Sequence, residues 1–149
     1  MRNQYASELA RHRPNELLIA RENGYVGTAV RADMRTVDRS NVTRLWEFKI
    51  RASYEALGQI LVYMAMARRA EEANGNAHLI RGVIAAFDFQ PELIYAVERL
   101  NLSIELVTLP ATLRSDVLHV SKATPIPMIP RRSGLFTPTD TASRQQETP

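Results

Sequence analysis

The chain has 149 residues, of which 45% are hydrophobic, and a chain of this size can bury one core, so we expect a single main domain. It contains no cysteine, which excludes a disulfide framework, a thiolate zinc site and a cysteine-ligated iron–sulfur cluster. The net charge is +3, and the four basic and two acidic residues from Lys122 onward contribute +2 of it, so charge alone supports a nucleic-acid partner only weakly.

The first predicted elements are a short helix and a hairpin of two strands. Residues 14–23 have Pro14 where a first helical turn tolerates it, Glu16 near the positive end of the helix dipole and Gly24 as a stop, so we predict a helix there. Residues 28–37 alternate apolar and charged side chains, which is the period of a half-buried strand. Residues 43–50 alternate again after a polar turn at 38–41, so the two strands are predicted to pair as a hairpin.

The next elements predict a sheet with helices packed on it. Residues 53–74 are rich in Ala, Leu and Met and end before Gly75, as a packed helix would. Residues 79–87 are almost continuously apolar, which indicates a strand covered on both faces. Pro91 opens another helix, and residues 103–109 supply a last strand. The order predicts an α/β fold with a mixed central sheet flanked by helices.

The last 28 residues differ in composition from the rest. Residues 122–149 hold five of the eight prolines and are rich in Ser, Thr and Gln, which is typical of a segment that is disordered or docked on the surface. We therefore divide the chain into an α/β domain, residues 1–121, and a tail, residues 122–149.

A charge pair interrupts the second predicted strand. Side chains at i and i+2 share one face of a strand, so Glu47 and Lys49 point to one side while Trp46, Phe48 and Ile50 point to the core. Pairing of the hairpin can bring Asp33 onto the face of Glu47. Two neighbouring carboxylates repel unless a cation lies between them, and oxygen ligands favour Mg²⁺ or Mn²⁺ over zinc.

Lysine is rare in this chain, which has seventeen arginines and two lysines, Lys49 and Lys122. A lysine is a compact charge with a tunable pKa, suited to orienting a water or stabilising charge on a phosphate. The alternative is that an arginine-biased composition leaves its lysines at random positions.

The order of Asp33, Glu47-x-Lys49 and Gln59-x-x-x-Tyr63 resembles the PD-(D/E)XK nuclease superfamily, and the last pair looks most like its RecB-type and CRISPR-associated exonuclease branch. The resemblance runs from about residue 16 to 109 and implies a restriction-endonuclease-like core. It implies that Asp33 and Glu47 bind the metal, that Lys49 assists the attacking water, and that Gln59 and Tyr63, on one helical face, position the substrate or the outer shell of the metal.

The sequence departs from that pattern in two places. Ala32 stands where a proline often precedes the first aspartate, although the RecB-type branch commonly lacks this proline too. The cluster-binding cysteines of some relatives are missing, so no iron–sulfur cluster is expected. Some relatives use a glutamate of the first helix as an extra metal ligand, and Glu16 or Glu8 could match it; Glu16 would also suit a helix N-terminus without binding metal.

Several arginines flank the predicted site on strands or strand ends. They could contact phosphates, or they could form salt bridges with local acids, and the sequence does not separate these roles. They are Arg31, Arg35, Arg44 and Arg51.

Together these features predict a small nuclease that uses Mg²⁺ or Mn²⁺ to hydrolyse phosphodiesters, in DNA rather than RNA. A chain this short leaves little room for substrate recognition, so we expect a homodimer or a subunit of a larger complex, in a phage, mobile-element, repair or restriction context. No apolar run reaches the roughly 18 residues of a membrane span, and residues 1–13 are too charged for a signal peptide, so we expect a cytoplasmic protein without a membrane partner.

Two other functions are open. The chain could be a nuclease-like fold that has lost catalysis and serves as a binding or scaffolding module, although such a module has no physical reason to keep charged residues on a part-buried face. It could also be a small α/β protein that binds an anion or nucleotide, but no glycine-rich phosphate loop supports this.

Overall fold

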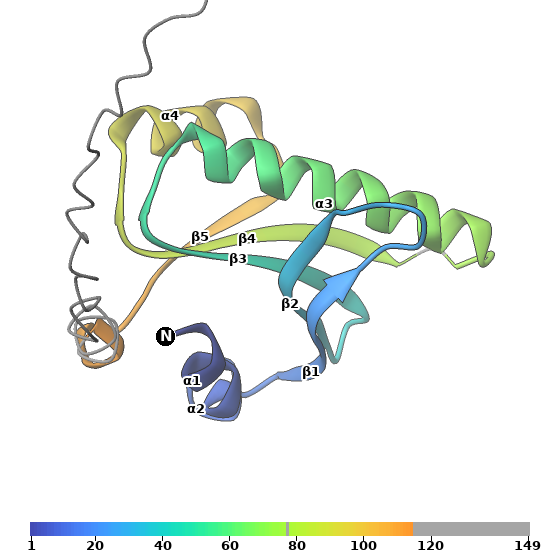
Figure 1. Ribbon diagram of the computed structural model, residues 1–149, viewed down its shortest axis with the longest axis horizontal. Coiled ribbons are helices and arrows are strands. Elements are labelled where there is room, and N and C mark those ends of the chain that lie inside the picture. The colour runs from blue at the N-terminus through green and yellow to red at the C-terminus, as the bar shows by residue number, and fades with distance from the viewer. Residues whose placement is uncertain (77, 115–149) are drawn as a thin grey trace, which may run out of the picture.

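The computed structural model describes residues 1–76 and 78–114, and within them the strands form one mixed sheet in the order β1-β2-β3-β4-β5 (Figure 1). β1, β2 and β3 pair antiparallel, whereas β3, β4 and β5 pair parallel. The predicted α/β fold with a mixed sheet is therefore confirmed. The strands are β1 (Glu16–Gly24), β2 (Arg31–Asp38), β3 (Val42–Ala52), β4 (Leu79–Phe89) and β5 (Ile104–Thr108).

Helices cover both faces of the sheet. The long α3 (Tyr54–Ala73) and α4 (Pro91–Leu100) lie on one face (Figure 1). The short α1 (Arg2–Ser7), α2 (Leu9–His12) and the 3-10 turn η1 (Ala111–Leu113) lie on the other. Each face has its own apolar cluster, so β3 and β4 are covered on both sides, as the almost continuous apolar sequence of β4 requires.

α3 begins and packs for local reasons. The Ser53 hydroxyl accepts the amide N–H of Glu55 at 3.3 Å, which satisfies one of the free donors at the helix start. A Cβ on Gly82 of β4 would lie 2.7 Å from Ile60 and 2.8 Å from Met64, so only glycine lets α3 approach β4 this closely. α3 therefore packs closely on β4, and it also contacts the neighbouring strand β3.

The hairpin and the later elements were predicted correctly. β2 and β3 pair in the register Met34 with Trp46, and Trp46 and Phe48 are buried under α1, as expected. Ile50 is an exception, because it is 48% exposed and lies outside the core. At Ile50, β3 has run past the apolar cluster beneath α1, so the alternation of the strand no longer points to buried surface.

The predicted helix at residues 14–23 is wrong, because this segment is the edge strand β1. Its backbone pairs with β2 from Glu16 opposite Asp38 to Gly24 opposite Arg31. The sheet edge offered by β2 decides the conformation, since pairing satisfies backbone groups that a short isolated helix would satisfy poorly. Two helices that the sequence did not indicate, α1 and α2, precede it.

The predicted tail, residues 122–149, lies outside the described residues, so its separation from the domain stays a prediction. Among the residues that the structure describes, none of the helices is both long enough and apolar enough to span a membrane.

Candidate active site

Asp33 and Glu47 come together where β2 separates from β3. The paired register of the two strands ends at Met34 and Trp46, which are the chain neighbours of Asp33 and Glu47. Beyond that point the Asp33 carboxylate itself accepts the backbone N–H of Phe48, at 2.9 Å from Oδ2. The side chain thus replaces a rung of the ladder and holds Asp33 beside Glu47.

Glu47 is a buried carboxylate with one close cation. It is 4% exposed, and Lys49 Nζ lies 2.7 Å from its Oε1. Burial raises the pKa of Glu47 and the negative charge of Asp33 adds to the rise, while the hydrogen bond from Lys49 opposes it without cancelling it. Burial therefore destabilises the charged form of Glu47, and a further cation nearby would offset this destabilisation.

The two residues predicted on the helix, Gln59 and Tyr63, lie on α3, and Tyr63 lies next to Glu47. Tyr63 is 8% exposed; burial raises the pKa of its hydroxyl, and the neighbouring Glu47 carboxylate raises it further. Gln59 lies one helical turn before it, and its buried Oε1 accepts no hydrogen bond from the described residues. Both line a cavity of about 400 Å³ that Arg31 also borders. Of the sequence-predicted residues, Asp33, Lys49 and Tyr63 lie next to Glu47, and Gln59 lies one helical turn from Tyr63. We call these five residues the candidate active site.

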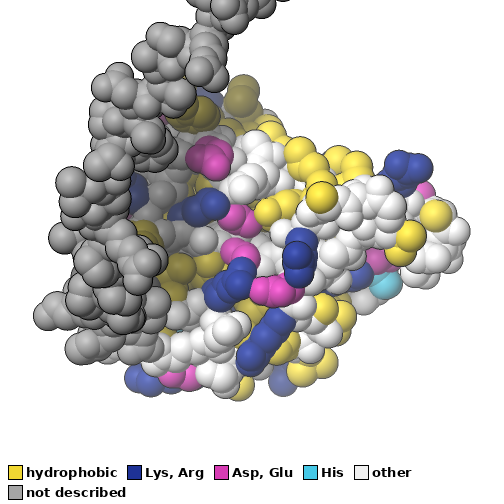
Figure 2. Space-filling model, in the orientation of Figure 1, with side chains coloured by type: hydrophobic (Ala, Val, Ile, Leu, Met, Phe, Trp, Pro, Cys, Tyr) yellow, Lys and Arg dark blue, Asp and Glu magenta, His cyan; other side chains and the backbone are white. Residues whose placement is uncertain are grey.

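Sequence reasoning missed two residues that lie against this site, Arg2 and Glu22. Arg2 Nη1 lies 2.6 Å from Asp33 Oδ1, and Arg2 Nη2 lies 2.7 Å from Glu22 Oε1. Glu22 is next to Asp33 because Arg21 pairs with Met34 across β1 and β2. Glu22 was not recognised because residues 14–23 were predicted to be a helix. No pattern in the sequence indicates Arg2. Acidic and basic side chains gather on this face between α3 and the N-terminal helices (Figure 2).

Glu16, the proposed extra metal ligand, is not part of the site. It pairs with Asp38, five residues along β2 from Asp33, which is about 16 Å at the rise of a strand. Its carboxylate accepts Arg13 Nε at 2.6 Å and the Thr36 hydroxyl at 2.7 Å. Glu8, the other possibility, lies between α1 and α2 near Arg11 and His12.

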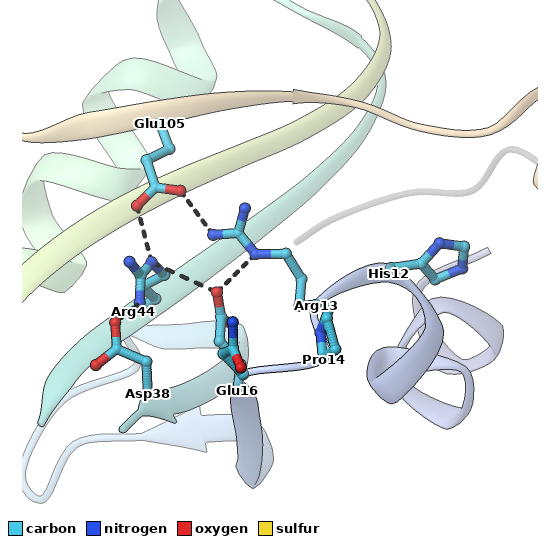
Figure 3. A pocket seen from close by; sticks show the side chains of 8 residues that line it. His12, Arg13, Pro14, Glu16, Asp38, Arg44 and Glu105 are labelled. Atoms are coloured by element: carbon cyan, nitrogen blue, oxygen red, sulfur yellow. Dashed lines mark hydrogen bonds and ion pairs between the residues drawn. The ribbon is translucent and has the colours of Figure 1, made fainter. Parts of the chain in front are cut away.

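Glu16 belongs instead to a group that we call the arginine network. Arg44 lies between Asp38, at 2.7 Å, and Glu105, at 2.8 Å, while Arg13 lies 2.7 Å from Glu105 (Figure 3). The network ties the edge strand β1 to β3 and to β5, and it lines a polar cavity of about 430 Å³. Its members are Arg13, Glu16, Asp38, Arg44 and Glu105.

Of the four arginines that could contact phosphates, Arg44 belongs to the arginine network, and the other three, which we expected to bind substrate, differ in exposure. Arg31 and Arg51 have side chains 61% and 65% exposed and only loose ion pairs, at 3.2 Å to Glu22 and 3.4 Å to Asp88. Arg35 is less free, because its Nη2 lies 2.7 Å from the buried Glu71 of α3. Arg31 and Arg51 can reach a phosphate without breaking a tight pair, whereas Arg35 is engaged in holding α3 to the sheet.

No family model and no curated protein matches this sequence. Among solved structures, the chain is similar to a repair endonuclease from Pyrococcus abyssi, with a TM-score of 0.54, 19% identity, 72% of this chain and 46% of that chain covered. It is also similar to EndoMS in a complex with double-stranded DNA (TM-score 0.53, 17% identity, 72% and 45% covered) and in apo form (TM-score 0.50, 19% identity, 72% and 46% covered).

The chain has a nuclease fold of the restriction-endonuclease-like kind. At these identities the likeness concerns the fold alone, and the chain spans about half the length of the structures it matches.

The site residues fit a hard divalent cation by their chemistry. Among the described residues, no three His, Asp or Glu side chains form a ready metal cage. Asp33 and Glu47 nevertheless offer carboxylate oxygens side by side. The cations that contact them in this structure are the Arg2 guanidinium, at Asp33, and the Lys49 ammonium, at Glu47. Mg²⁺ and Mn²⁺ are commonly bound by one or two carboxylates and complete their shell with water and phosphate oxygens.

Proposed function

We propose that this chain is a metal-dependent nuclease of the PD-(D/E)XK superfamily, in its RecB-like branch, that hydrolyses phosphodiester bonds in DNA. The observation that carries the proposal is the buried Glu47 carboxylate, which lies beside Asp33 with only Lys49 as a close cation and carries a raised pKa caused first by burial. Keeping such a group charged is costly, and strongly perturbed carboxylates in a cleft are typical of functional sites.

Asp33 and Glu47 are the residues that would bind Mg²⁺ or Mn²⁺. When bound, the cation supplies a Lewis acid that lowers the pKa of a water and offsets charge on the scissile phosphate. Glu16, predicted as a further ligand, lies too far along the strand to take part.

The other side chains have separable roles in this proposal. Lys49 Nζ, held at Glu47 Oε1, stands where it can orient the attacking water and stabilise charge that develops on the phosphate. Gln59 Oε1, buried without a partner in the described chain, can accept a hydrogen bond from a water or from the substrate strand. Tyr63 is expected to keep its proton, since burial and Glu47 raise its pKa, and so acts as a hydrogen-bond donor.

Support for DNA as the substrate comes from two sources. One of the similar structures is a complex with double-stranded DNA. In this chain, Arg31 and Arg51 are exposed beside the site and can bind phosphates electrostatically, without reading sequence. We propose that the active form is a homodimer or a subunit of a larger complex, because the described residues leave little surface for recognition, and that it works in the cytoplasm.

A second candidate function is a catalytically silent nuclease fold that serves as a binding or scaffolding module. The observation that favours it is the Arg2–Asp33 ion pair of 2.6 Å, since a permanent internal cation would make a metal unnecessary. The two functions differ in whether the protein binds a divalent cation at Asp33.

The deciding experiment is a cleavage assay with the full chain. Labelled double-stranded DNA, single-stranded DNA and RNA are incubated with Mg²⁺ or Mn²⁺ and the wild type, Glu47→Gln, or the control Glu98→Gln on the exposed face of α4. We expect DNA cleavage that requires the metal, is lost in Glu47→Gln and is kept in Glu98→Gln. A wild type that cuts none of the three substrates with either ion would overturn the nuclease proposal.

A further inference from the structure

The candidate active site already contains a cation that belongs to the protein, the guanidinium of Arg2. Its two terminal nitrogens contact different carboxylates, Asp33 on β2 at 2.6 Å and Glu22 on β1 at 2.7 Å. Charge-assisted contacts of this length are the stronger kind of hydrogen bond. One side chain from α1 therefore neutralises acids from two adjacent strands.

Arg2 contacts the Asp33 carboxylate oxygen that a metal ion would need as a ligand. Asp33 Oδ2 accepts the backbone N–H of Phe48, so Oδ1 is the oxygen turned toward the site, and Oδ1 is the atom that Arg2 contacts. A bound Mg²⁺ or Mn²⁺ needs a carboxylate oxygen within roughly 2.0 to 2.2 Å. Two cations at one oxygen repel each other, so the metal and the guanidinium exclude one another there.

The position of Arg2 is fixed by packing. Three residues further along α1, Tyr5 is 2% exposed, and its ring centroid lies 5.4 Å from that of Phe48 and 5.6 Å from that of Trp46. These two aromatic residues flank Glu47 on β3. α1 is therefore anchored beneath the site, and Arg2 reaches the acids from a preset place rather than from a loose chain end.

The backbone of Glu22 also has an unusual conformation at this contact. It is a non-glycine residue with a φ of 49°, in the left-handed region that costs most residues energy. Its second oxygen lies 3.2 Å from Arg31, so the carboxylate is held between two arginines. A cavity of about 300 Å³ is lined by the four side chains Arg2, Glu22, Arg31 and Asp33, which leaves space for a hydrated ion next to the guanidinium.

We propose that Arg2 is an autoinhibitory placeholder, which neutralises Asp33 and Glu22 in the metal-free protein and must leave Asp33 before a divalent cation can bind there. The inference rests on the proposed function, because it presupposes a metal site at Asp33 and Glu47. Coupling of this kind is reciprocal: removal of the guanidinium tightens metal binding, and bound metal releases Arg2 from Asp33.

The test is calorimetric titration of the full chain with Mn²⁺, without nucleic acid. Arg2→Gln keeps a polar side chain but is shorter and removes the charge, and we expect Mn²⁺ to bind it about tenfold more tightly than the wild type, within the usual range of coupling between sites. Arg11→Gln is the matched control, because Arg11 is 81% exposed and 3.7 Å from Glu8; its affinity should equal that of the wild type.

Thermal melting supplies a second readout. Without metal, Arg2→Gln should melt at or below the wild-type temperature, since the two acids lose their counter-ion. Saturating Mn²⁺ should then raise its melting temperature by more than it raises that of the wild type. A folded Arg2→Gln with unchanged or weaker Mn²⁺ affinity overturns the inference.

A further variant covers the case in which Arg2→Gln does not fold. Arg2→Lys keeps the charge, but one ammonium cannot bridge both carboxylates as the fork does, so its Mn²⁺ affinity should lie between those of the wild type and the expected Arg2→Gln. A Mn²⁺ affinity weaker than that of the wild type counts against the placeholder.

Asp33→Asn separates this inference from the function on which it rests. If Asp33→Asn loses the Mn²⁺ binding of the wild type while the Arg2 variants change nothing, the metal site stands and the placeholder fails. If neither the wild type nor the folded Arg2 variants bind Mn²⁺, the metal site itself fails and this inference fails with it.

Discussion

The candidate active site and the arginine network both include charged residues of β2 and β3, about five residues apart along β2, yet the pKa shifts of their glutamates are opposite. In the network, burial pushes the pKa of Glu105 upward, but hydrogen bonds from Arg13 and Arg44 outweigh it, and the pKa lies below its ordinary value. In the active site, burial raises the pKa of Glu47, and Lys49 does not compensate.

The contrast teaches how a structural charge cluster differs from a functional one. Each carboxylate of the network lies within hydrogen-bonding distance of an arginine, whose fork matches a carboxylate, so the charges are satisfied within the chain. Glu47 and Asp33 lie side by side, and Glu47 keeps an electrostatic cost that a ligand can remove. A count of charged residues would not separate the two groups, whereas the balance of cations around each acid does.

The largest effect on stability is expected from Arg44→Ala in the network. The Arg44 side chain is 12% exposed and contacts Asp38 at 2.7 Å and Glu105 at 2.8 Å, so its removal leaves Asp38 without an arginine and leaves Glu105 with Arg13 alone. We expect the free energy of unfolding to fall by about 3 kcal/mol, the lower end of the cost of breaking a buried pair, because Arg13 still pairs with Glu105. Urea denaturation measures this loss, with Arg68→Ala on the exposed face of α3 as the control. A loss no larger than that of the control would show that the network does not hold the sheet edge.

Lys49→Ala in the active site should show the reverse pattern. Cleavage should fall by about 10² to 10³, the usual effect of removing an electrostatic group at a developing charge. The free energy of unfolding should change by only about 1 kcal/mol, since Lys49 is 30% exposed and Glu47, whose pKa is already raised, can take up a proton instead of remaining charged and unpaired.

The measurement is a cleavage assay beside thermal melting of the same preparation. If Lys49→Ala is largely unfolded, Lys49 and Glu47 form a structural ion pair like those of the network, and the loss of cleavage then says nothing about catalysis.

The two glutamates should give opposite and smaller pH effects. Because the folded-state pKa of Glu105 is lowered, its stabilisation is complete above the ordinary glutamate pKa of about 4.3 and is lost as the pH falls through the folded value. Because the folded-state pKa of Glu47 is raised, its contribution favours folding below about pH 4.3 and is lost as the pH rises through the raised value.

Urea denaturation between about pH 2.5 and pH 8 should reveal these two trends when each variant is compared with the wild type. The wild type should lose its advantage over Glu105→Gln on acidification, whereas its stability relative to Glu47→Gln should improve. Equal trends for both variants would contradict the electrostatic contrast between the two regions.

The smallest effect is expected from deleting the tail from residue 123 onward. Its composition is poor in the apolar surface that folding requires, and both charge groups lie within residues 1–114. The melting temperature and the Mn²⁺ affinity should therefore stay nearly unchanged in calorimetry. A fall of many degrees would show that apolar residues such as Ile129 or Phe136 pack on the domain or on a second copy.

Much of the fold could be predicted because local patterns and tertiary structure agree. The alternation through Asp33 and Glu47 predicted the hairpin, and the register confirms it. The failures occur where a local pattern suited two structures. Pro14, Glu16 and Gly24 suit a helix as well as they suit an edge strand, and the unpaired edge of β2 selected the strand. Ile50 followed the alternation but lies beyond the cover of the core.

By itself, the sequence predicted the order of elements from residue 28 onward and placed Glu47 with Lys49 on one strand face and Gln59 with Tyr63 on one helix face, because strand and helix periods place side chains on faces without reference to distant parts of the chain. Only the tertiary structure decided which charges those residues meet. Arg2 reaches Asp33 across 31 residues, and Arg13 reaches Glu105 across 92. Such pairings depend on how α1 packs beneath β3 and how β5 joins the sheet, so no local pattern could show that Glu16 is a structural acid and Glu22 the neighbour of the site.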